Sequence, residues 1–295
     1  MRYTILKYVI AISIFFTSVA TVFAQNKKQE VSVYVSGGLS TLSYDTQMGK
    51  NNNKAGGSFG IGYTYFLTEN IGLNTGLEFT LYGAEYKHDM FGNVAYNMVD
   101  PSDQELYDYH TVINNYKEEQ KATYINIPLM LQFQHGEKNK WYIAAGAKLG
   151  IPVKGKYKSS ASELTNKGYF HDTGNWAESQ EFMGFGTFDN YSVDKEFDLN
   201  VACILSAELG MKWHLKDNMA LYTGGYIDYG VNDIVKGSRD RNLIEIEESS
   251  EGFAPINNSM LHSSIGYNSN TLTQKLTEKV VPLSVGLKIR LSLAL

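Results

Sequence analysis

Six histidines are the side chains of this sequence best suited to acid–base or metal chemistry: His88, His110, His135, His171, His214 and His262. They form no HExxH motif and no clustered metal-ligand spacing, so we predict no metal and no bound cofactor. A hydrolase set could still be assembled from His262, Ser263 and Ser264 with Glu247 or Glu248. Because geometry defines a catalytic set, a polar loop is the simpler interpretation, and we predict that the chain is not an enzyme.

Eight segments of alternating apolar and polar residues are predicted to be the strands that position these side chains. They lie near Val31–Thr41, Gly56–Leu67, Ile71–Glu85, Ala122–Gln134, Trp141–Pro152, Phe197–Leu215, Met219–Val231 and Val280–Leu295. In the second segment, Phe59, Ile61 and Tyr63 share one parity and therefore one face. The opposite face carries Gly60 and Gly62, and such small residues suit a narrow interior better than a water-facing surface.

Short turns and long loops alternate between the eight segments. The short turns are Thr68–Asn70, His135–Lys140 and Lys216–Asn218, and the predicted long loops are Leu42–Ala55, Tyr86–Lys121, Val153–Glu196 and Asn232–Lys279. This layout predicts an all-β fold, an eight-stranded antiparallel up-and-down transmembrane β-barrel with short periplasmic turns and longer outer loops. Ten strands are the alternative, with Asn242–Glu247 paired to part of Ala254–Tyr267. We prefer to interpret these two segments as strand extensions above the membrane.

The N-terminus is predicted to be an export signal over residues 1–24, with Arg2 and Lys7 as its basic start. The apolar run that follows has about 13 residues, fewer than the ~20 that a membrane helix needs. Residues 25–295 are then one barrel domain located in the bacterial outer membrane. Removal of the signal changes the formal net charge from −5 to −7, which argues against nucleic acid as a partner.

Seven charged side chains are predicted to point into the barrel lumen by parity: Glu78, Lys148, Glu208, Lys212, Asp228, Lys288 and Arg290. Charges in a narrow interior must pair, because an unpaired buried charge costs several kcal/mol. They could line an ion path or form a static salt-bridged plug. We favour the plug, since the interiors of eight-stranded barrels are filled by side chains.

Two groups of aromatic residues have predicted roles at surfaces. Tyr65, Phe133, Trp141 and Trp213 lie outward by parity beside short turns, which predicts an aromatic girdle that contacts outer-membrane lipid. The third loop contains Trp176, Phe182, Phe185, Phe188 and Tyr191. Exposed aromatic residues often anchor protein or glycan ligands, but these five could equally form a small core of the loop itself.

Several short segments resemble a known family. They are the GGL segment Gly37–Leu39, the IPLML segment Ile127–Leu131 and the GLK segment Gly286–Lys288. The chain resembles the PorT-like outer-membrane β-barrel proteins of Bacteroidota and is similar in architecture to small OmpA/OmpX-type barrels. The resemblance supports the fold and assigns no catalytic residue. We expect a structural or binding role through the outer loops. The resemblance implies a secretion-machinery assembly factor as one alternative, and a lipid-modifying enzyme is the other.

Overall fold

The computed structural model describes residues 29–100, 104–216, 218–249, 252–265 and 274–295. The predicted export signal therefore lies outside the described residues. The elements are β1 (Gln29–Ser43), β2 (Lys50–Asn53), β3 (Ala55–Phe66), β4 (Ile71–Val99), β5 (Leu106–His135), β6 (Lys140–Phe170), β7 (Asn175–Ala177), η1 (Glu181–Met183), β8 (Gly186–Phe197), β9 (Ala202–Lys216), β10 (Met219–Gly230), β11 (Arg241–Asn242), β12 (Ile244–Ser249), β13 (Gly252–Asn257), η2 (Met260–His262), β14 (Ser263–Ile265), β15 (Gln274–Lys275) and β16 (Val281–Ala294). Among these residues, no helix is long and apolar enough to cross a membrane.

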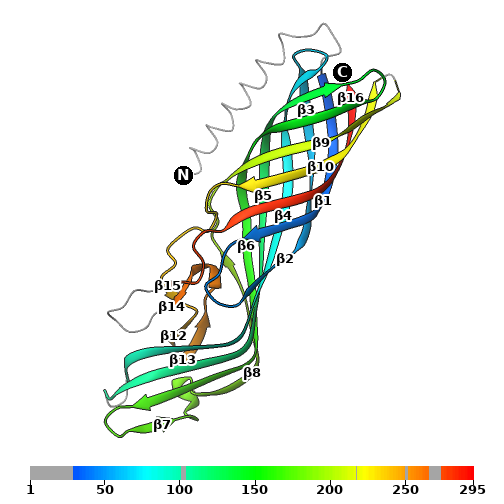
Figure 1. Ribbon diagram of the computed structural model, residues 1–295. Coiled ribbons are helices and arrows are strands. Elements are labelled where there is room, and N and C mark those ends of the chain that lie inside the picture. The colour runs from blue at the N-terminus through cyan, green and yellow to red at the C-terminus, as the bar shows by residue number, and fades with distance from the viewer. Residues whose placement is uncertain (1–28, 101–103, 217, 250–251, 266–273) are drawn as a thin grey trace.

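Eight strands close into an antiparallel barrel (Figure 1). Each of β1, β3, β4, β5, β6, β9, β10 and β16 pairs with the barrel strands that precede and follow it in the chain. The first and last strands close the ring, with pairs from Glu30↔Ala294 to Ser43↔Val281. The predicted up-and-down barrel of eight strands is confirmed, and no backbone edge is left open within it.

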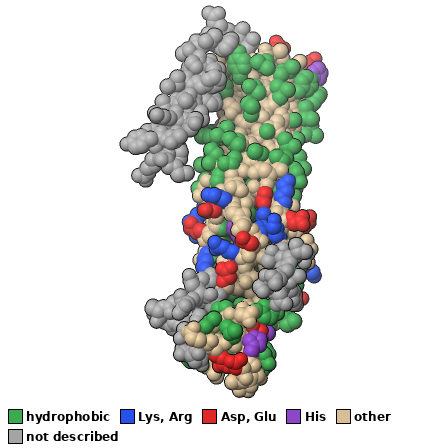
Figure 2. Space-filling view, turned by 90° about the vertical axis from the view of Figure 1, so that its left-hand side faces the viewer, with side chains coloured by type: hydrophobic (Ala, Val, Ile, Leu, Met, Phe, Trp, Pro, Cys, Tyr) green, Lys and Arg blue, Asp and Glu red, His purple; other side chains and the backbone are tan. Residues whose placement is uncertain are grey.

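The apolar face of the barrel wall is on the outside at the end that carries the short turns. Val33 is 57% exposed and Ile61 is 58% exposed, whereas Tyr34 and Glu78, of the opposite parity, are buried inside. Figure 2 shows the resulting apolar band, which ends at a belt of charged side chains farther along the molecule. A barrel that kept its apolar side chains in a central core would have the opposite arrangement, so this wall suits hydrocarbon.

Three strands continue far beyond the apolar band, which corrects two predicted loops. Most of Tyr86–Lys121 belongs to a long ribbon of β4 and β5, and Val153–Glu196 belongs largely to β6 and β8. The polarity of the two faces inverts in this region: Tyr82 and Tyr116 are buried on the inner face, while Lys87 lies on the outer face. We call this part of β4–β8 the distal extension. At the start of the distal extension, apolar side chains no longer alternate onto the outer face. The sequence pattern used to predict barrel strands therefore ends there.

The segment between β10 and β16 folds against the inner face of the distal extension. Ile234, Leu243, Met260 and Leu276 from this segment share one buried apolar cluster with residues of the extension. The predicted pairing of Asn242–Glu247 with part of Ala254–Tyr267 occurs as β12 with β13. The two strands form a sheet of their own. They therefore neither raise the barrel to ten strands nor extend the barrel strands, as we had preferred.

The start of the sixth predicted strand also needs correction. Phe197 is the last residue of β8, and the barrel strand β9 begins only at Ala202. Leu199, which lies within the predicted range of this strand, is instead buried in the apolar cluster of the distal extension. The alternation continued without a break through this corner, so parity alone could not show where the wall begins.

Candidate functional site

Lys148 stands at the centre of a buried charge network in the lumen. Its ammonium nitrogen lies 2.9 Å from Oε1 of Glu78 and 2.8 Å from Oδ2 of Asp228. The second carboxylate oxygen of Asp228 accepts a hydrogen bond of 2.6 Å from Ser206. The three charged residues come from β6, β4 and β10, so these contacts join distant parts of the wall.

Two further lysines form ion pairs nearby. Lys288 on β16 binds Glu208 on β9, and its ammonium nitrogen lies 4.1 Å from the ring centre of Tyr34. Lys212 binds Glu30, whose other carboxylate oxygen accepts a hydrogen bond of 2.7 Å from the Tyr222 hydroxyl. All three lysines of the network therefore have carboxylate partners away from water.

Arg290 is held differently from the lysines. Its Nη2 donates a hydrogen bond of 2.8 Å to Oε1 of Gln132, and its guanidinium lies 3.9 Å from the ring centre of Tyr222. The ring of Tyr142 lies on the same guanidinium at 5.5 Å. Among the described residues, Arg290 forms no ion pair within 4.0 Å, so aromatic faces and an amide oxygen stabilise its charge.

The structure buries all seven predicted lumen residues inside the barrel and adds an eighth, Glu30. With Glu30 included, four acids face four bases, so the formal charges cancel. The sequence did contain the signal for Glu30. It has the inward parity of Ser32 and Tyr34, but we had placed the start of the first strand at Val31, two residues after its actual start at Gln29.

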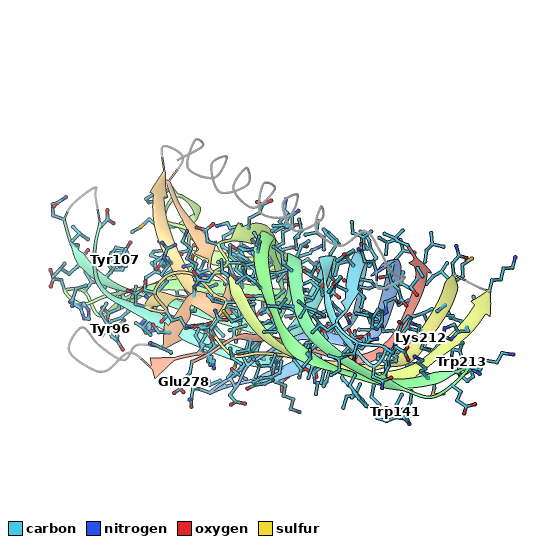
Figure 3. All side chains as sticks on the ribbon, turned by 90° about the horizontal axis from the view of Figure 1, so that it is seen from above. Tyr96, Tyr107, Trp141, Lys212, Trp213 and Glu278 are labelled. Carbon is cyan, nitrogen blue, oxygen red and sulfur yellow. The ribbon has the colours of Figure 1, made fainter. Side chains whose placement is uncertain are left out.

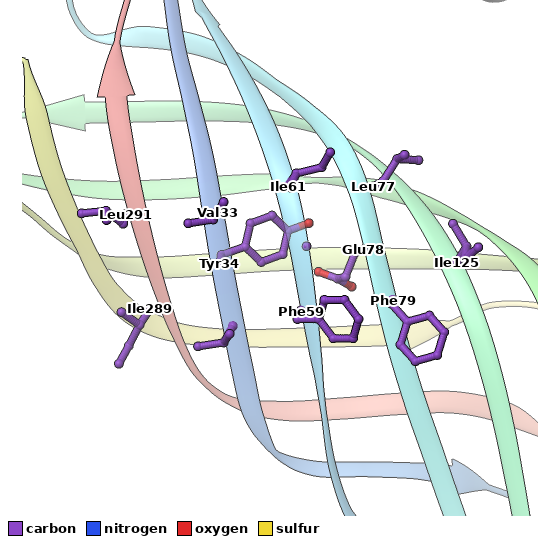
Figure 4. A pocket seen from close by; sticks show the side chains of 12 residues that line it. Val33, Tyr34, Phe59, Ile61, Leu77, Glu78, Phe79, Ile125, Ile289 and Leu291 are labelled. Atoms are coloured by element: carbon purple, nitrogen blue, oxygen red, sulfur yellow. The ribbon is translucent and has the colours of Figure 1, made fainter.

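A shallow apolar hollow lies on the outer wall over β1, β3, β4 and β16 (Figure 4). It measures about 700 Å³, and Val33, Ile61, Leu77 and Leu291 are among its lining residues. Its walls belong to the apolar band, so lipid tails are the chemically matched occupants. The hollow adds no reactive group to the lumen network.

The predicted girdle residues lie at the short-turn end of the barrel. Phe133, Trp141 and Trp213 are exposed, and Tyr65 is half-buried. The rings of Phe133 and Trp141 are 5.4 Å apart, and Trp213 Nε1 donates a hydrogen bond of 2.9 Å to Thr223. Figure 3 shows Trp141 and Trp213 near one end of the molecule and Tyr96 and Tyr107 near the other.

The five aromatic residues predicted as a loop binding surface are divided by the structure. Phe185 is fully buried, and its ring packs 5.3 Å from that of Tyr109, so it belongs to a small core and not to a surface. Tyr191 is half-buried against the larger apolar cluster. Trp176, Phe182 and Phe188 remain exposed at the far end of the distal extension. Spacing alone could not separate the two groups.

Trp176 is the exposed centre of an aromatic platform, which we define as Trp176 with the half-buried Tyr169 and His110. The Trp176 ring lies 5.1 Å from the ring of Tyr169, its partner across β6 and β7, and 4.8 Å from that of His110. Trp176 is 52% exposed. Partial burial lowers the pKa of His110, so the imidazole is mostly neutral at pH 7.

The histidine and serine residues considered for hydrolysis do not contact one another in a catalytic arrangement. His262 Nε2 is 3.1 Å from the carbonyl oxygen of Lys236, and Ser263 Oγ donates a hydrogen bond to the carbonyl of Ser259. The side chains of Glu247 and Glu248 lie outside what the structure describes. Within the described part of the chain, no group of three or more His, Cys, Asp or Glu residues could hold a metal ion.

Comparison with known proteins places this architecture in a family. Residues 23–236 match the family described as outer membrane protein beta-barrel domain, which is more than half of the chain. The chain belongs to this family. No curated protein matches the sequence. Membership of this family places the β-barrel in the outer membrane, where its apolar band contacts lipid.

Solved structures of small outer-membrane proteins are similar to this β-barrel at low identity. Neisserial surface protein A is 10% identical with a TM-score of 0.35, over 91% of this chain and 97% of that one. Ail, the attachment invasion locus protein of Yersinia pestis, is 12% identical with a TM-score of 0.28, over 89% and 99%. OprG of Pseudomonas aeruginosa is 11% identical with a TM-score of 0.25, over 88% and 95%.

Proposed function

We propose that this outer-membrane β-barrel is a non-enzymatic anchor that presents the distal extension outside the cell to bind a protein or glycan. The observation that carries the proposal is the aromatic platform around the exposed Trp176, held on paired strands and not on a loose loop. A side chain on a rigid element loses little conformational freedom when a ligand binds. The barrel then serves to hold this surface away from the membrane.

The lumen network supports an anchor more than a channel. Lys148, Glu78 and Asp228 satisfy one another in the interior, and an ion that entered would have to separate these pairs. We expect planar bilayer recordings with the purified barrel to stay silent. Long-lived open channels would contradict this part of the proposal without affecting the binding surface.

The surroundings of the platform suit a polar ligand with an apolar face. His171 Nε2 lies 3.1 Å from Oδ1 of Asp108, and an ion pair of 2.8 Å joins Lys167 to Glu178. Both pairs lie on residues next to the platform in sequence or across a strand. An aromatic centre with a hydrogen-bonding rim is a common arrangement at binding surfaces, and it can stack on a sugar ring or a peptide side chain.

The test compares two tryptophan variants of the full-length protein in nanodiscs. Trp176→Ala removes the centre of the platform, and Trp213→Ala removes an exposed tryptophan at the opposite end. Both are probed with an array of purified glycans and with detergent-solubilised outer membrane. We expect the wild type and Trp213→Ala to capture the same ligand and Trp176→Ala to lose it. Equal capture by all three proteins would overturn the proposed binding surface.

The pull-down also distinguishes the two alternative roles. Co-purification of secretion components that persists in Trp176→Ala would favour an assembly factor, the role implied by the PorT resemblance. A changed lipid A mass spectrum in cells that lack the protein would favour a lipid-modifying enzyme. For the enzyme alternative, His262 and Ser263 make hydrogen bonds to backbone carbonyl groups and not to each other. The assembly role rests on the resemblance alone.

A further inference from the structure

A basic hollow lies on the outer wall just beyond the apolar band. It measures about 360 Å³ and is lined by residues of β3–β6 and the segment before β3, among them Lys54, Gly83, Lys121, Lys154 and Lys156. Four lysines and one glutamate face this hollow. In a chain whose formal net charge is −5, this local excess of positive charge stands out. The belt of charged side chains to which it belongs is visible in Figure 2.

Two of these lysines face each other without an intervening acid. Lys121 on β5 is the direct partner of Lys156 on β6, and both lie on the outer face of the sheet. Like charges directly opposite each other on a sheet destabilise it. Among the described residues, neither lysine has an ion-pair partner within 4.0 Å. A bound anion would remove this repulsion.

The acids around the hollow are already engaged by other lysines. Glu119, the glutamate that faces the hollow, is 2.8 Å from Lys117 and 3.7 Å from Lys54. Glu85 nearby lies within 3.2 Å of Lys54, Lys87 and Lys117. Glu196, the cross-strand partner of Lys156 on its other side, is 2.5 Å from Lys154. Glu196 is therefore shared between Lys154 and Lys156, and Lys121 and Lys156 keep ammonium groups that can contact a group from outside the protein.

A glycine keeps the floor of the hollow open. Gly83 is the partner of Lys121 across β4 and β5, so it occupies the outward position beside that lysine. A side-chain carbon built on Gly83 would lie 3.4 Å from Cβ of Lys54. A larger side chain at this position would fill the floor of the hollow beside Lys54 and Lys121.

The position of the hollow next to the apolar band indicates which kind of anion it suits. Leu81, two residues before Gly83 on the same face, and Val153 beside Lys154 are exposed apolar residues of the band. Two strand residues span about 6.6 Å, so the lysines lie about the depth of a lipid headgroup beyond the edge of the apolar band. A phosphate at this level can remain attached to acyl chains that lie against the band, whereas a soluble anion gains nothing from that apolar surface.

We propose that this hollow binds the phosphate of a phosphorylated outer-leaflet lipid, with Lys121 and Lys156 as its principal contacts. The assignment to the outer leaflet rests on the orientation in the proposed function, with the distal extension outside the cell. Lysine ammonium groups are common ligands of phosphate, and their bonds strengthen where the ligand is partly removed from water. Such a lipid would also fix the level of the barrel in the membrane.

The test measures lipid binding to the full-length barrel in detergent by native mass spectrometry. The probes are bis-phosphorylated lipid A, the same lipid after removal of both phosphates, and inorganic phosphate as a competitor. We expect Lys121→Gln with Lys156→Gln to bind the phosphorylated lipid about tenfold more weakly or worse, since two charged contacts are lost. Lys138→Gln with Lys216→Gln, which removes two exposed lysines at the short-turn end, is expected to bind as the wild type does.

A second variant keeps the charges and fills the space. Gly83→Val leaves every lysine in place, and it is expected to weaken binding of the phosphorylated lipid while the heat-shift mobility of the folded barrel is retained. Equal binding of the dephosphorylated lipid would overturn recognition of the phosphate. Full competition by millimolar inorganic phosphate would overturn the lipid as its source. If the glycan or protein ligand at Trp176 is never found but the lysine variants lose the lipid, only the proposed function fails.

Discussion

Lys148 and Glu78 are 70 positions apart in the chain, yet the Lys148 ammonium nitrogen lies 2.9 Å from the Glu78 carboxylate inside the lumen. Both side chains are buried. They project from β6 and β4, which are separated in the wall by β5, so the pair joins strands that share no backbone hydrogen bonds. The lumen network therefore adds side-chain contacts through the barrel interior to the backbone hydrogen bonds between neighbouring strands.

Replacing Lys148 with methionine tests this cross-lumen contact. The variant leaves the carboxylates of Glu78 and Asp228 buried without their cation, which costs about 3–5 kcal/mol of unfolding free energy. Urea unfolding of the barrel in detergent micelles measures the loss. The matched control is Lys138→Met in an exposed turn, for which we expect little change. Equal stability of the two variants would show that the network does not hold the barrel together.

An arginine scan at two valines tests which face of the wall contacts lipid. Val285 is exposed within the apolar band, and Val285→Arg should cost about 2–4 kcal/mol of stability in the membrane. Val112 is similarly exposed on β5, but it lies in the distal extension. Val112→Arg should therefore be nearly neutral. The heat-shift mobility of the two variants after refolding into lipid vesicles measures the difference, and equal behaviour would place the lipid boundary elsewhere.

The barrel could be predicted because its wall obeys a two-residue period imposed by lipid on one side and polar groups on the other. Leu81 is an outward apolar residue of that period, and the next residue, Tyr82, points inward. The inward position of Tyr82 becomes informative only farther along the strand, where the outer face is polar. Beyond Gly83 the apolar side chains change to the inner face, where they pack against the segment before β16. The sequence pattern there is that of a sheet with one buried apolar face and one polar face. The segment that covers the apolar face comes much later in the chain.

The contacts of single residues were harder to predict than the strands. The lumen residues were found by parity, because every inward position of a narrow barrel is close to others. Phe185 and Trp176 have no such rule: both are aromatic residues among glycines in one loop region, and only the fold buries the first and exposes the second. Glu118 likewise meets Ser259 across 141 positions, a contact that no local pattern encodes.

Glu118 is expected to hold the segment before β16 against the distal extension. Its buried carboxylate accepts hydrogen bonds from the Tyr116 hydroxyl, the Gln120 amide, the Ser259 hydroxyl and the Met260 backbone N–H. Burial raises the pKa of this carboxyl above its ordinary value. Glu118→Ala leaves buried donors unsatisfied, at about 1–3 kcal/mol each. We expect faster hydrogen exchange around Met260 and faster proteolysis of the same segment.

The neighbouring residue provides the control for Glu118. Glu119 faces outward and is half-exposed, so Glu119→Ala removes a carboxylate of the same strand without opening the interior. Its exchange rates around Met260 are expected to match those of the wild type. If Glu118→Ala also matched the wild type, the apolar cluster alone would hold this segment in place.

Glu85 gives the charged belt a defined response to acid. Hydrogen bonds from Lys87, and then from Lys54 and Lys117, lower the pKa of its carboxyl to about 2 against the opposing effect of burial. A folded-state pKa below the unfolded value contributes stability at pH values above about 4.5, and that contribution is lost as the pH falls towards 2. Glu85→Gln should therefore lower the free energy of unfolding at pH 7 by about 0.2–1 kcal/mol for each ion pair lost, which is read as a lower thermal midpoint. The gap to the wild type should narrow between pH 4.5 and 2, whereas Glu137→Gln, which removes an exposed turn carboxylate, should show no gap at either pH. A gap for Glu85→Gln that stays constant over this range would assign its effect to packing and not to charge.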